Sequence, residues 1–234
     1  MRLDVLKAMN AARRERRAGV MITRLADGDQ RFVEAAGFRA DPLADSLETA
    51  LRMGKSGVVS LDGAEYFLTV QAPSLRLTLI GAVHISQALA PMARIAGLDV
   101  TVIDPRTAFA TPERFPDTPV VVEWPEDALA AAPPDRFTAV CLLTHDPKID
   151  DPALVVALRA DCFYIGALGS KKTHAKRLER MRASGFDDAA LARIHAPIGL
   201  DIGAVSPAEI AVSIIGEIVA AQRRRPLRSE AAAP

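Results

Sequence analysis

Cysteine is scarce in this sequence: only Cys141 and Cys162 carry a thiol among 234 residues. They lie in separate apolar runs, and no histidine or cysteine stands at metal-ligand spacing from either. A disulfide framework or a metal site is therefore disfavoured. We expect two thiols buried in the core and no metal.

Net charge and long apolar runs are also missing. Lys plus Arg and Asp plus Glu both number 29, so the formal net charge is zero and gives no global electrostatic case for nucleic acid or membrane binding. The apolar runs are too short to span a bilayer, and the first residues lack the apolar core of a signal peptide. We therefore expect a cytoplasmic protein. Half of the residues are apolar, enough for a real core in one large domain or two smaller ones.

Residues 1–73 have the pattern of a small α+β domain. Apolar residues at helical spacing open the chain, and a second short helix is predicted at 46–53, ending at Gly54. Two β-hairpins are predicted, at 20–33 and 58–70, each around an Asp-Gly pair.

From residue 74 to 225 short apolar runs alternate with helical patterns, which is typical of a Rossmann-like α/β domain with a parallel sheet. Strands are predicted at 77–80, 100–103, 120–122, 139–143 and 162–165, and helices at 85–96, 152–160, 171–184, 189–195 and 207–223. Asp151-Pro152 and Ser206-Pro207 resemble a capping residue followed by proline at the first helical position. The tail, 226–234, is rich in Ala, Ser and Pro, which predicts disorder.

The first strand of this domain runs into Gly81, at the position of the dinucleotide-binding turn. Asp104 ends the next strand at about the spacing expected of a carboxylate that accepts both ribose hydroxyl protons. The second and third glycines of that fingerprint are replaced by Val83 and Ser86. The pattern favours the fold, and it leaves open whether the phosphate site is kept, retuned or lost.

Two further loops carry polar residues after predicted strands, where open α/β sheets bind ligands. The first is Thr144-His145-Asp146, in which His145 is a candidate acid, base or hydrogen-bonding group, or an exposed loop residue beside two turn caps. The second holds Gly166, Gly169, Ser170 and Lys171 and opens a helix, which favours an anion site. The basic run that follows (Lys176, Arg177, Arg180 and Arg182) is also consistent with a solvated helix face.

A third loop, residues 195–204, contains Pro197, Gly199 and Gly203 around an apolar-flanked Asp201. Structural packing explains the proline and Gly199. Asp201 is expected either to be hydrogen-bonded in the core or to face the crevice.

These clusters, in this order, resemble the C-terminal domain of the XdhC/CoxI family of molybdenum-cofactor chaperones. The resemblance rests on Thr-His-Asp, Tyr-Ile-Gly-x-x-Gly-Ser and Pro-Ile-Gly-Leu-Asp-Ile-Gly-Ala followed by Pro-x-Glu-Ile-Ala, and it covers about 77–217. Gly81-x-x-His84 and Asp104-x-Arg106 with Phe109-Ala110 also match.

The resemblance implies a non-catalytic accessory protein that binds molybdenum cofactor, as molybdopterin or its dinucleotide form. It would assist the cofactor's sulfuration and insertion into a xanthine dehydrogenase- or carbon monoxide dehydrogenase-type molybdoenzyme. The implied cofactor-binding residues are Gly81, His84, Asp104, Arg106, Thr144, His145, Asp146, Gly166, Gly169, Ser170, Lys171 and Asp201. The Gly-Gly-Cys-Val-Glu-like motif usual in the family's N-terminal domain has no counterpart before Ser74, so cysteine-based sulfur handling there is not expected.

Two other hypotheses stay open. One is an NAD(P)-dependent oxidoreductase with Asp104 on the ribose and His145 as proton donor, against which Val83 argues. The other is an interaction module built on a degenerate Rossmann domain. For partners we expect a molybdoenzyme client, with a cysteine desulfurase as a candidate second partner. The strand edges of the first domain favour a homodimer.

Overall fold

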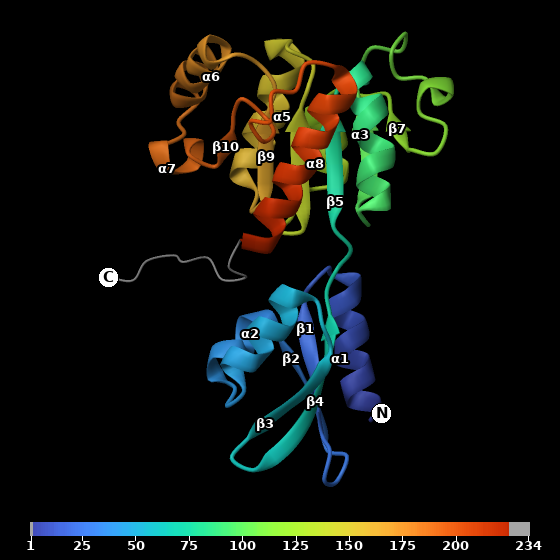
Figure 1. Cartoon of the computed structure of the whole chain (residues 1–234), viewed down its shortest axis with the longest axis vertical. Helices are drawn as coiled ribbons and strands as arrows, with labels where there is room; N and C mark the ends of the chain where they lie inside the picture. The colour runs from blue at the N-terminus through green and yellow to red at the C-terminus, as the bar shows by residue number, and fades with distance from the viewer. Residues whose placement is uncertain (1, 225–234) are drawn as a thin grey trace. The chain divides into compact units, whose positions relative to one another are not determined.

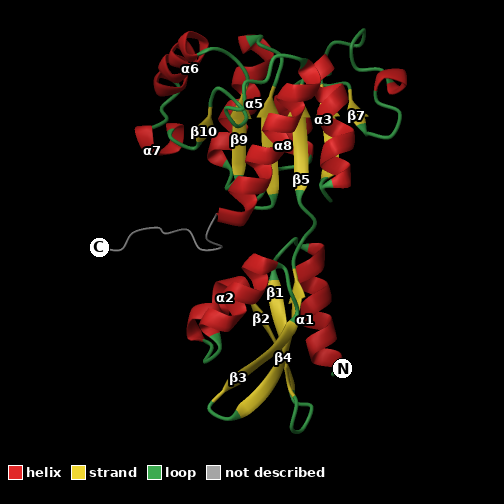
Figure 2. Cartoon of the chain, viewed as in Figure 1, coloured by secondary structure: helices red, strands yellow, loops and turns green. Residues whose placement is uncertain are grey.

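The structure is a computed structural model that describes residues 2–224, drawn in Figures 1 and 2. Residues up to Pro73 belong to one compact unit, and Ser74–Arg224 form the other. The tail predicted for residues 226–234 lies outside the described residues. Within residues 2–224, no helix has both the length and the apolar composition needed to cross a membrane.

The first unit is a four-stranded antiparallel sheet with helices. Its elements are α1 (Leu3–Arg14), β1 (Gly19–Arg24), β2 (Gln30–Glu34), the 3-10 helix η1 (Ala35–Ala40), α2 (Ala44–Met53), β3 (Gly57–Leu61) and β4 (Ala64–Gln71). The strand order is β2-β1-β4-β3, so both predicted hairpins are present. Val5 and Met9 of α1 pack on Met21 and Phe32, while α2 contacts β1 and β4 from the other side (Figure 1).

The second unit is a six-stranded, all-parallel sheet with helices on both faces (Figure 2). Its strands are β5 (Arg76–Ile80), β6 (Asp99–Ile103), β7 (Val120–Val121), β8 (Thr138–Leu142), β9 (Tyr164–Ala167) and β10 (Ile194–His195). Its helices are α3 (His84–Ile95), η2 (Pro112–Arg114), α4 (Pro125–Ala131), α5 (Pro147–Arg159), α6 (Lys171–Ala183), α7 (Asp188–Leu191) and α8 (Pro207–Arg224).

The strand order is β10-β9-β8-β5-β6-β7, which is the order of a doubly wound dinucleotide-binding domain. The chain runs outward from β5 to β7, then returns to the other side of β5 and continues outward to β10. The predicted Rossmann-like fold is thereby confirmed. The order reverses between β5 and β8, so the loops that follow these two strands flank the crevice in which such sheets bind ligands.

Alternating side chains of the strands build two cores, one on each face of the sheet. Leu77 and Leu79 of β5 point to the core that α3 and α8 cover, whereas Ile80 points to the core under α4 and α5. The thiols divide in the same way, with Cys141 in the first core and Cys162 in the second. Both cysteines are buried, as predicted. Cover on both faces explains why the strands are almost entirely apolar.

Helix starts follow the predicted capping chemistry at α8 but not at α5. Ser206 caps α8: its Oγ accepts from the Glu209 N–H at 3.3 Å, and the Glu209 carboxylate accepts from the Ser206 N–H at 2.8 Å. The prediction that Asp151-Pro152 opens a helix is wrong. Helix α5 begins earlier, at Pro147, and Asp146 is its cap. The Asp146 side chain accepts a hydrogen bond from the N–H of Lys148, which would otherwise have no partner in the first turn.

Three further regions differ from the prediction. The helix expected at 189–195 ends at Leu191, and Ile194–His195 pairs with β9 as the edge strand β10. Strand β9 runs over 164–167 instead of 162–165, because Gly166 stays in the ladder opposite Cys141 instead of starting a turn. Helix α4 was not predicted, although Pro125 and two acidic residues mark its first turn.

Candidate functional site

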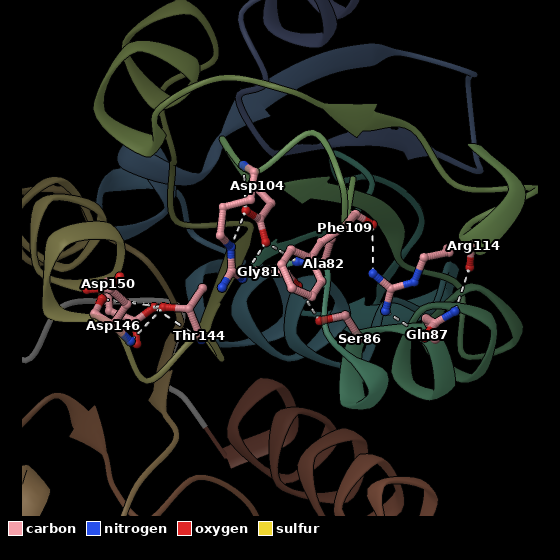
Figure 3. Close-up of polar contacts among 11 residues, drawn as sticks. Gly81, Ala82, Ser86, Gln87, Asp104, Phe109, Arg114, Thr144, Asp146 and Asp150 are labelled. Atoms are coloured by element: carbon pink, nitrogen blue, oxygen red, sulfur yellow. Dashed lines mark hydrogen bonds and ion pairs between the residues drawn. The ribbon is translucent and has the colours of Figure 1, made fainter. Parts of the chain in front are cut away.

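Most of the predicted site residues lie at the carboxyl ends of the central strands. Gly81 follows β5, Asp104 and Arg106 follow β6, Thr144 follows β8, and the Gly169-Ser170 turn follows β9. Because these strands are parallel neighbours, loops distant in the sequence meet at one edge of the sheet. Figure 3 shows that edge, with a central group, a group around Thr144 and a group around Arg114; the residues labelled are Gly81, Ala82, Ser86, Gln87, Asp104, Phe109, Arg114, Thr144, Asp146 and Asp150.

The turn after β5 is held tightly against the loop after β8. Gly81 has φ +113°, and a Cβ on it would lie 2.7 Å from Cγ2 of Thr144. Ser86, which replaces the third glycine of the fingerprint, donates from its hydroxyl to the Gly81 carbonyl at 2.5 Å. Val83 precedes α3, and His84 is its exposed first residue. The close approach of the two loops therefore requires glycine at position 81.

Asp104 is fully buried, and its carboxylate is hydrogen-bonded on both oxygens. Oδ2 accepts from the Ala82 N–H and from Arg106 Nη2, each at 2.7 Å. Oδ1 accepts from the backbone N–H and from Nε of Arg106, each at 2.9 Å. Burial alone would raise the pKa of this carboxyl, but the hydrogen bonds from Arg106 and the backbone outweigh it and hold the pKa below its ordinary value.

Beside this pair lies a stack of arginines on an aromatic ring. The Arg106 guanidinium lies 4.6 Å from the centroid of the Phe109 ring, and Arg114 lies 5.7 Å from the same centroid. Arg114 also donates to the Phe109 carbonyl at 2.8 Å and to the Gln87 side chain at 3.0 Å. These contacts hold the segment after β6 against α3.

The loop after β8 is organised by an aspartate that sequence reasoning missed. Asp150 is buried, and its Oδ1 accepts from the Thr144 hydroxyl at 2.7 Å. The Thr144 hydroxyl in turn accepts from the Asp146 N–H at 3.0 Å. His145 at the tip is exposed and has φ +63°, a conformation that residues other than glycine adopt rarely. Burial raises the pKa of Asp150, and the Thr144 hydrogen bonds oppose that shift.

The turn after β9 leads into a thirteen-residue helix, α6. Ser170 caps it, with its Oγ accepting from the Thr173 N–H at 3.2 Å, and Lys171 is exposed in the first turn. Gly169 has φ +133°. Gly166 does not belong to this turn: it is buried in β9, where a Cβ would lie 2.5 Å from the Ile198 side chain.

A buried cation lies beneath this turn. Arg177 is only 2% exposed, so the solvated face predicted for the basic run does not include it. Its Nη2 donates to the Leu168 carbonyl at 2.9 Å, whereas Nε and Nη1 have no hydrogen-bond partner. Oδ2 of Asp150 has no partner either. Burial lowers the pKa of Arg177, and the negative charge of Asp150 opposes that shift. The spacing of Arg177 and Met181, one helical turn apart on the buried side, was the available sequence signal.

The third predicted loop is fixed by Glu217 of α8, a residue that sequence reasoning did not single out. Its carboxylate accepts from the Tyr164 hydroxyl at 2.6 Å and from the Gly199 N–H at 2.8 Å. Nδ1 of His195 lies 3.1 Å from its other oxygen. Asp201, expected in the core or facing the crevice, is exposed. Among residues 2–224, no cluster of three or more His, Cys, Asp or Glu side chains could hold a metal ion.

The chain was compared with known proteins. Residues 77–218 match the family model described as the XdhC Rossmann domain. Curated relatives include YqeB of Escherichia coli K12 (30% identical, 68% of this chain, 30% of the relative) and the molybdenum cofactor insertion chaperone PaoD of the same strain (32%, 78% and 50%). Another is a probable xanthine dehydrogenase subunit of Bacillus subtilis 168 (32%, 65% and 44%). The chain thus matches half of these relatives' length or less.

A solved structure described as a xanthine dehydrogenase from Bacillus halodurans aligns with 98% of this chain and 65% of its own chain. The TM-score is 0.66 and the sequence identity 21%, so this likeness concerns the fold alone. The family match spans more than half of the chain and coincides with the parallel-sheet unit that carries the candidate site. The resemblance read from the motifs is confirmed, and the chain belongs to the XdhC family.

Proposed function

We propose that this protein is a molybdenum cofactor-binding chaperone that assists the sulfuration and insertion of the cofactor in a xanthine dehydrogenase- or carbon monoxide dehydrogenase-type enzyme. The observation that carries the proposal is that the loops after β5 and β8 meet at the point where the strand order reverses, in a domain related to a named cofactor insertion chaperone. We infer an accessory protein that holds and transfers its ligand.

The amino end of α6 fits the anionic part of such a ligand. Backbone N–H groups in the first turn of a helix lack intrahelical partners, and the helix dipole favours negative charge there. The exposed ammonium of Lys171 adds a positive charge to that turn. Arg177 is tied to the segment before this turn by the hydrogen bond from its Nη2 to the Leu168 carbonyl, and its Nε and Nη1 have no hydrogen-bond partner. A pterin phosphate is an anion of the kind that this turn would hold, and His84, His145 and Asp146 would line the rest of the crevice.

The partners follow from the same proposal. The client would be a molybdenum hydroxylase, and a cysteine desulfurase would supply the sulfur. The free edges β2 and β3 of the first unit's sheet favour a homodimer, and we place the protein in the cytoplasm.

The decisive experiment is native and denaturing mass spectrometry of protein purified anaerobically from cells that make molybdenum cofactor. We expect a bound molybdopterin species. Lys171→Gln should lower its occupancy severalfold, whereas Lys176→Gln, which removes an exposed ammonium further along α6, should leave it unchanged. Wild-type protein without any pterin would contradict the proposal, and equal losses in both variants would contradict the assignment of the α6 turn.

A further inference from the structure

The acidic residue at the end of the second strand is the ribose-binding group of a Rossmann dinucleotide site. In this chain that residue is Asp104, at the end of β6 beside the Gly81 turn. A ribose diol binds there by donating both hydroxyl protons to carboxylate oxygens. The state of those oxygens therefore decides whether the turn can take a nucleotide.

Asp104 has no acceptor position left for a diol. A carboxylate offers about four lone-pair positions, and four N–H donors contact this one, two on each oxygen. Two of the donors are backbone groups, from Ala82 and Arg106, and hold the Gly81 turn to the segment after β6. The other two belong to the Arg106 guanidinium, which occupies the acceptor positions that a ribose diol would need.

Contacts other than those with Asp104 also hold Arg106 in this position. Its guanidinium stacks on Phe109 at 4.6 Å, and the negative charges of Asp104, Asp146 and Asp150 all favour its charged form. Its side chain is one third exposed whereas that of Asp104 is fully buried, so solvent reaches the arginine and not the carboxylate. A ribose would have to displace a charged, stacked group from a buried partner, which is far costlier than displacing water.

We propose that Arg106 closes the ribose position of the Gly81 turn, so that the crevice excludes nicotinamide dinucleotides and admits a ligand that places no ribose at Asp104. Arg106 is thus a specificity-determining residue. The exclusion of dinucleotides stands by itself, whereas its bearing on the pterin ligand rests on the proposed function.

The experiment is a calorimetric titration of the full chain with NADH, NADPH and AMP. We expect no binding of any of the three to the wild-type protein at millimolar ligand concentrations. Arg106→Ala leaves one backbone donor on each Asp104 oxygen and frees the rest, so NADH and AMP should bind at least about tenfold more tightly than to wild type, the effect of one or two hydrogen bonds to a charged group. The double variant Asp104→Asn/Arg106→Ala should lose that gain.

Arg114→Ala is the matched control, because Arg114 lies over the same Phe109 ring and does not contact Asp104; it should show no gain. Phe109→Ala removes the ring on which Arg106 stacks but keeps the charges of Arg106 and Asp104, so it should show a smaller gain in affinity. This variant tests the proposal if Arg106→Ala does not fold. Tight binding of NADH by wild type would overturn the proposal. So would tight NADPH binding, which would make Arg106 a 2′-phosphate ligand, or a folded Arg106→Ala protein without any gain. None of these outcomes bears on whether a pterin is bound, so this proposal and the chaperone function fail independently.

Discussion

At the scale of single residues, Glu217 decides how the third loop is held. One carboxylate joins Tyr164 of β9, His195 of β10 and the backbone of Gly199 to α8. Burial by itself would raise the pKa of Glu217, but the hydrogen bonds from His195, Tyr164 and Gly199 outweigh it and lower the pKa below its ordinary value. The charged form therefore stabilises the folded state.

We expect Glu217→Gln to lower the free energy of unfolding at pH 7 by about 1.5–3 kcal/mol, the range for hydrogen bonds to a charged group. The pKa of a glutamate in an unfolded chain is about 4.3, and that of folded Glu217 lies lower. The stabilisation is thus complete above about pH 4.3 and is lost as pH falls through the folded-state value.

Urea denaturation of both proteins between pH 7 and pH 3 measures this effect. The difference between wild type and Glu217→Gln should shrink at the acidic end. Glu179→Gln, at an exposed position on α6, serves as the control and should differ little from wild type at every pH. A difference for Glu217→Gln that stays constant down to pH 3 would show that the residue acts through packing and not through its charge.

At the scale of elements, the candidate site depends on contact between the turn after β5 and the loop after β8. The sheet places β5 and β8 side by side although almost sixty residues separate them in the chain. The Leu143 N–H donates to the Ile80 carbonyl at 2.9 Å, which continues the pairing past the strand ends. The two loops therefore approach to van der Waals distance, and Gly81 is where they meet.

Gly81→Ala tests this contact against Gly97→Ala. Both glycines have positive φ, but a Cβ at Gly97 would meet no atom within 4 Å, whereas one at Gly81 would meet Thr144. Gly97→Ala should lower the free energy of unfolding only by the strain of a positive φ at alanine, about 1–2 kcal/mol. Gly81→Ala should cost about 1–3 kcal/mol more through overpacking. Thermal unfolding measures both, and equal losses would argue against close packing of the two loops.

At the scale of the whole molecule, the parallel-sheet unit has what an independent domain needs. It contains a core on each face of its sheet, and the family match lies wholly inside it. The candidate site is built from residues of this unit alone.

We therefore expect a fragment that begins at Ser74 to fold by itself, as a domain boundary at residues 73–74 requires. Its far-UV circular dichroism should show helix and strand, and its urea unfolding should be a single cooperative transition. A fragment that lacks a cooperative transition, while the full chain keeps one, would show that the second unit needs the first.

Most elements of the fold were predictable because their signals are local. Apolar periodicity and turn residues identify the two hairpins of the first unit and the first four strands of the second, and Ser206-Pro207 marks the start of α8. The start of α5 and the whole of α4 were missed although their capping signals are local. The other errors arose where pairing with a distant segment overrode the local pattern. Ile194–His195 became a strand because β9 offers an edge, and Gly166 stayed in β9 because Ile198 needs the space above it.

For the site, the sequence by itself determined which loops carry polar residues, the position of the Gly81 turn and the family, because these depend on residue types at short spacing. Only the tertiary structure decided what those residues contact. The Asp104 carboxylate is hydrogen-bonded to the Arg106 guanidinium, and Arg177 is buried. Glu217 connects β9, β10 and the loop at Gly199 to α8. The physical reason is that burial and hydrogen-bond saturation depend on which strands become neighbours, and strand order is set by contacts between residues far apart in the chain.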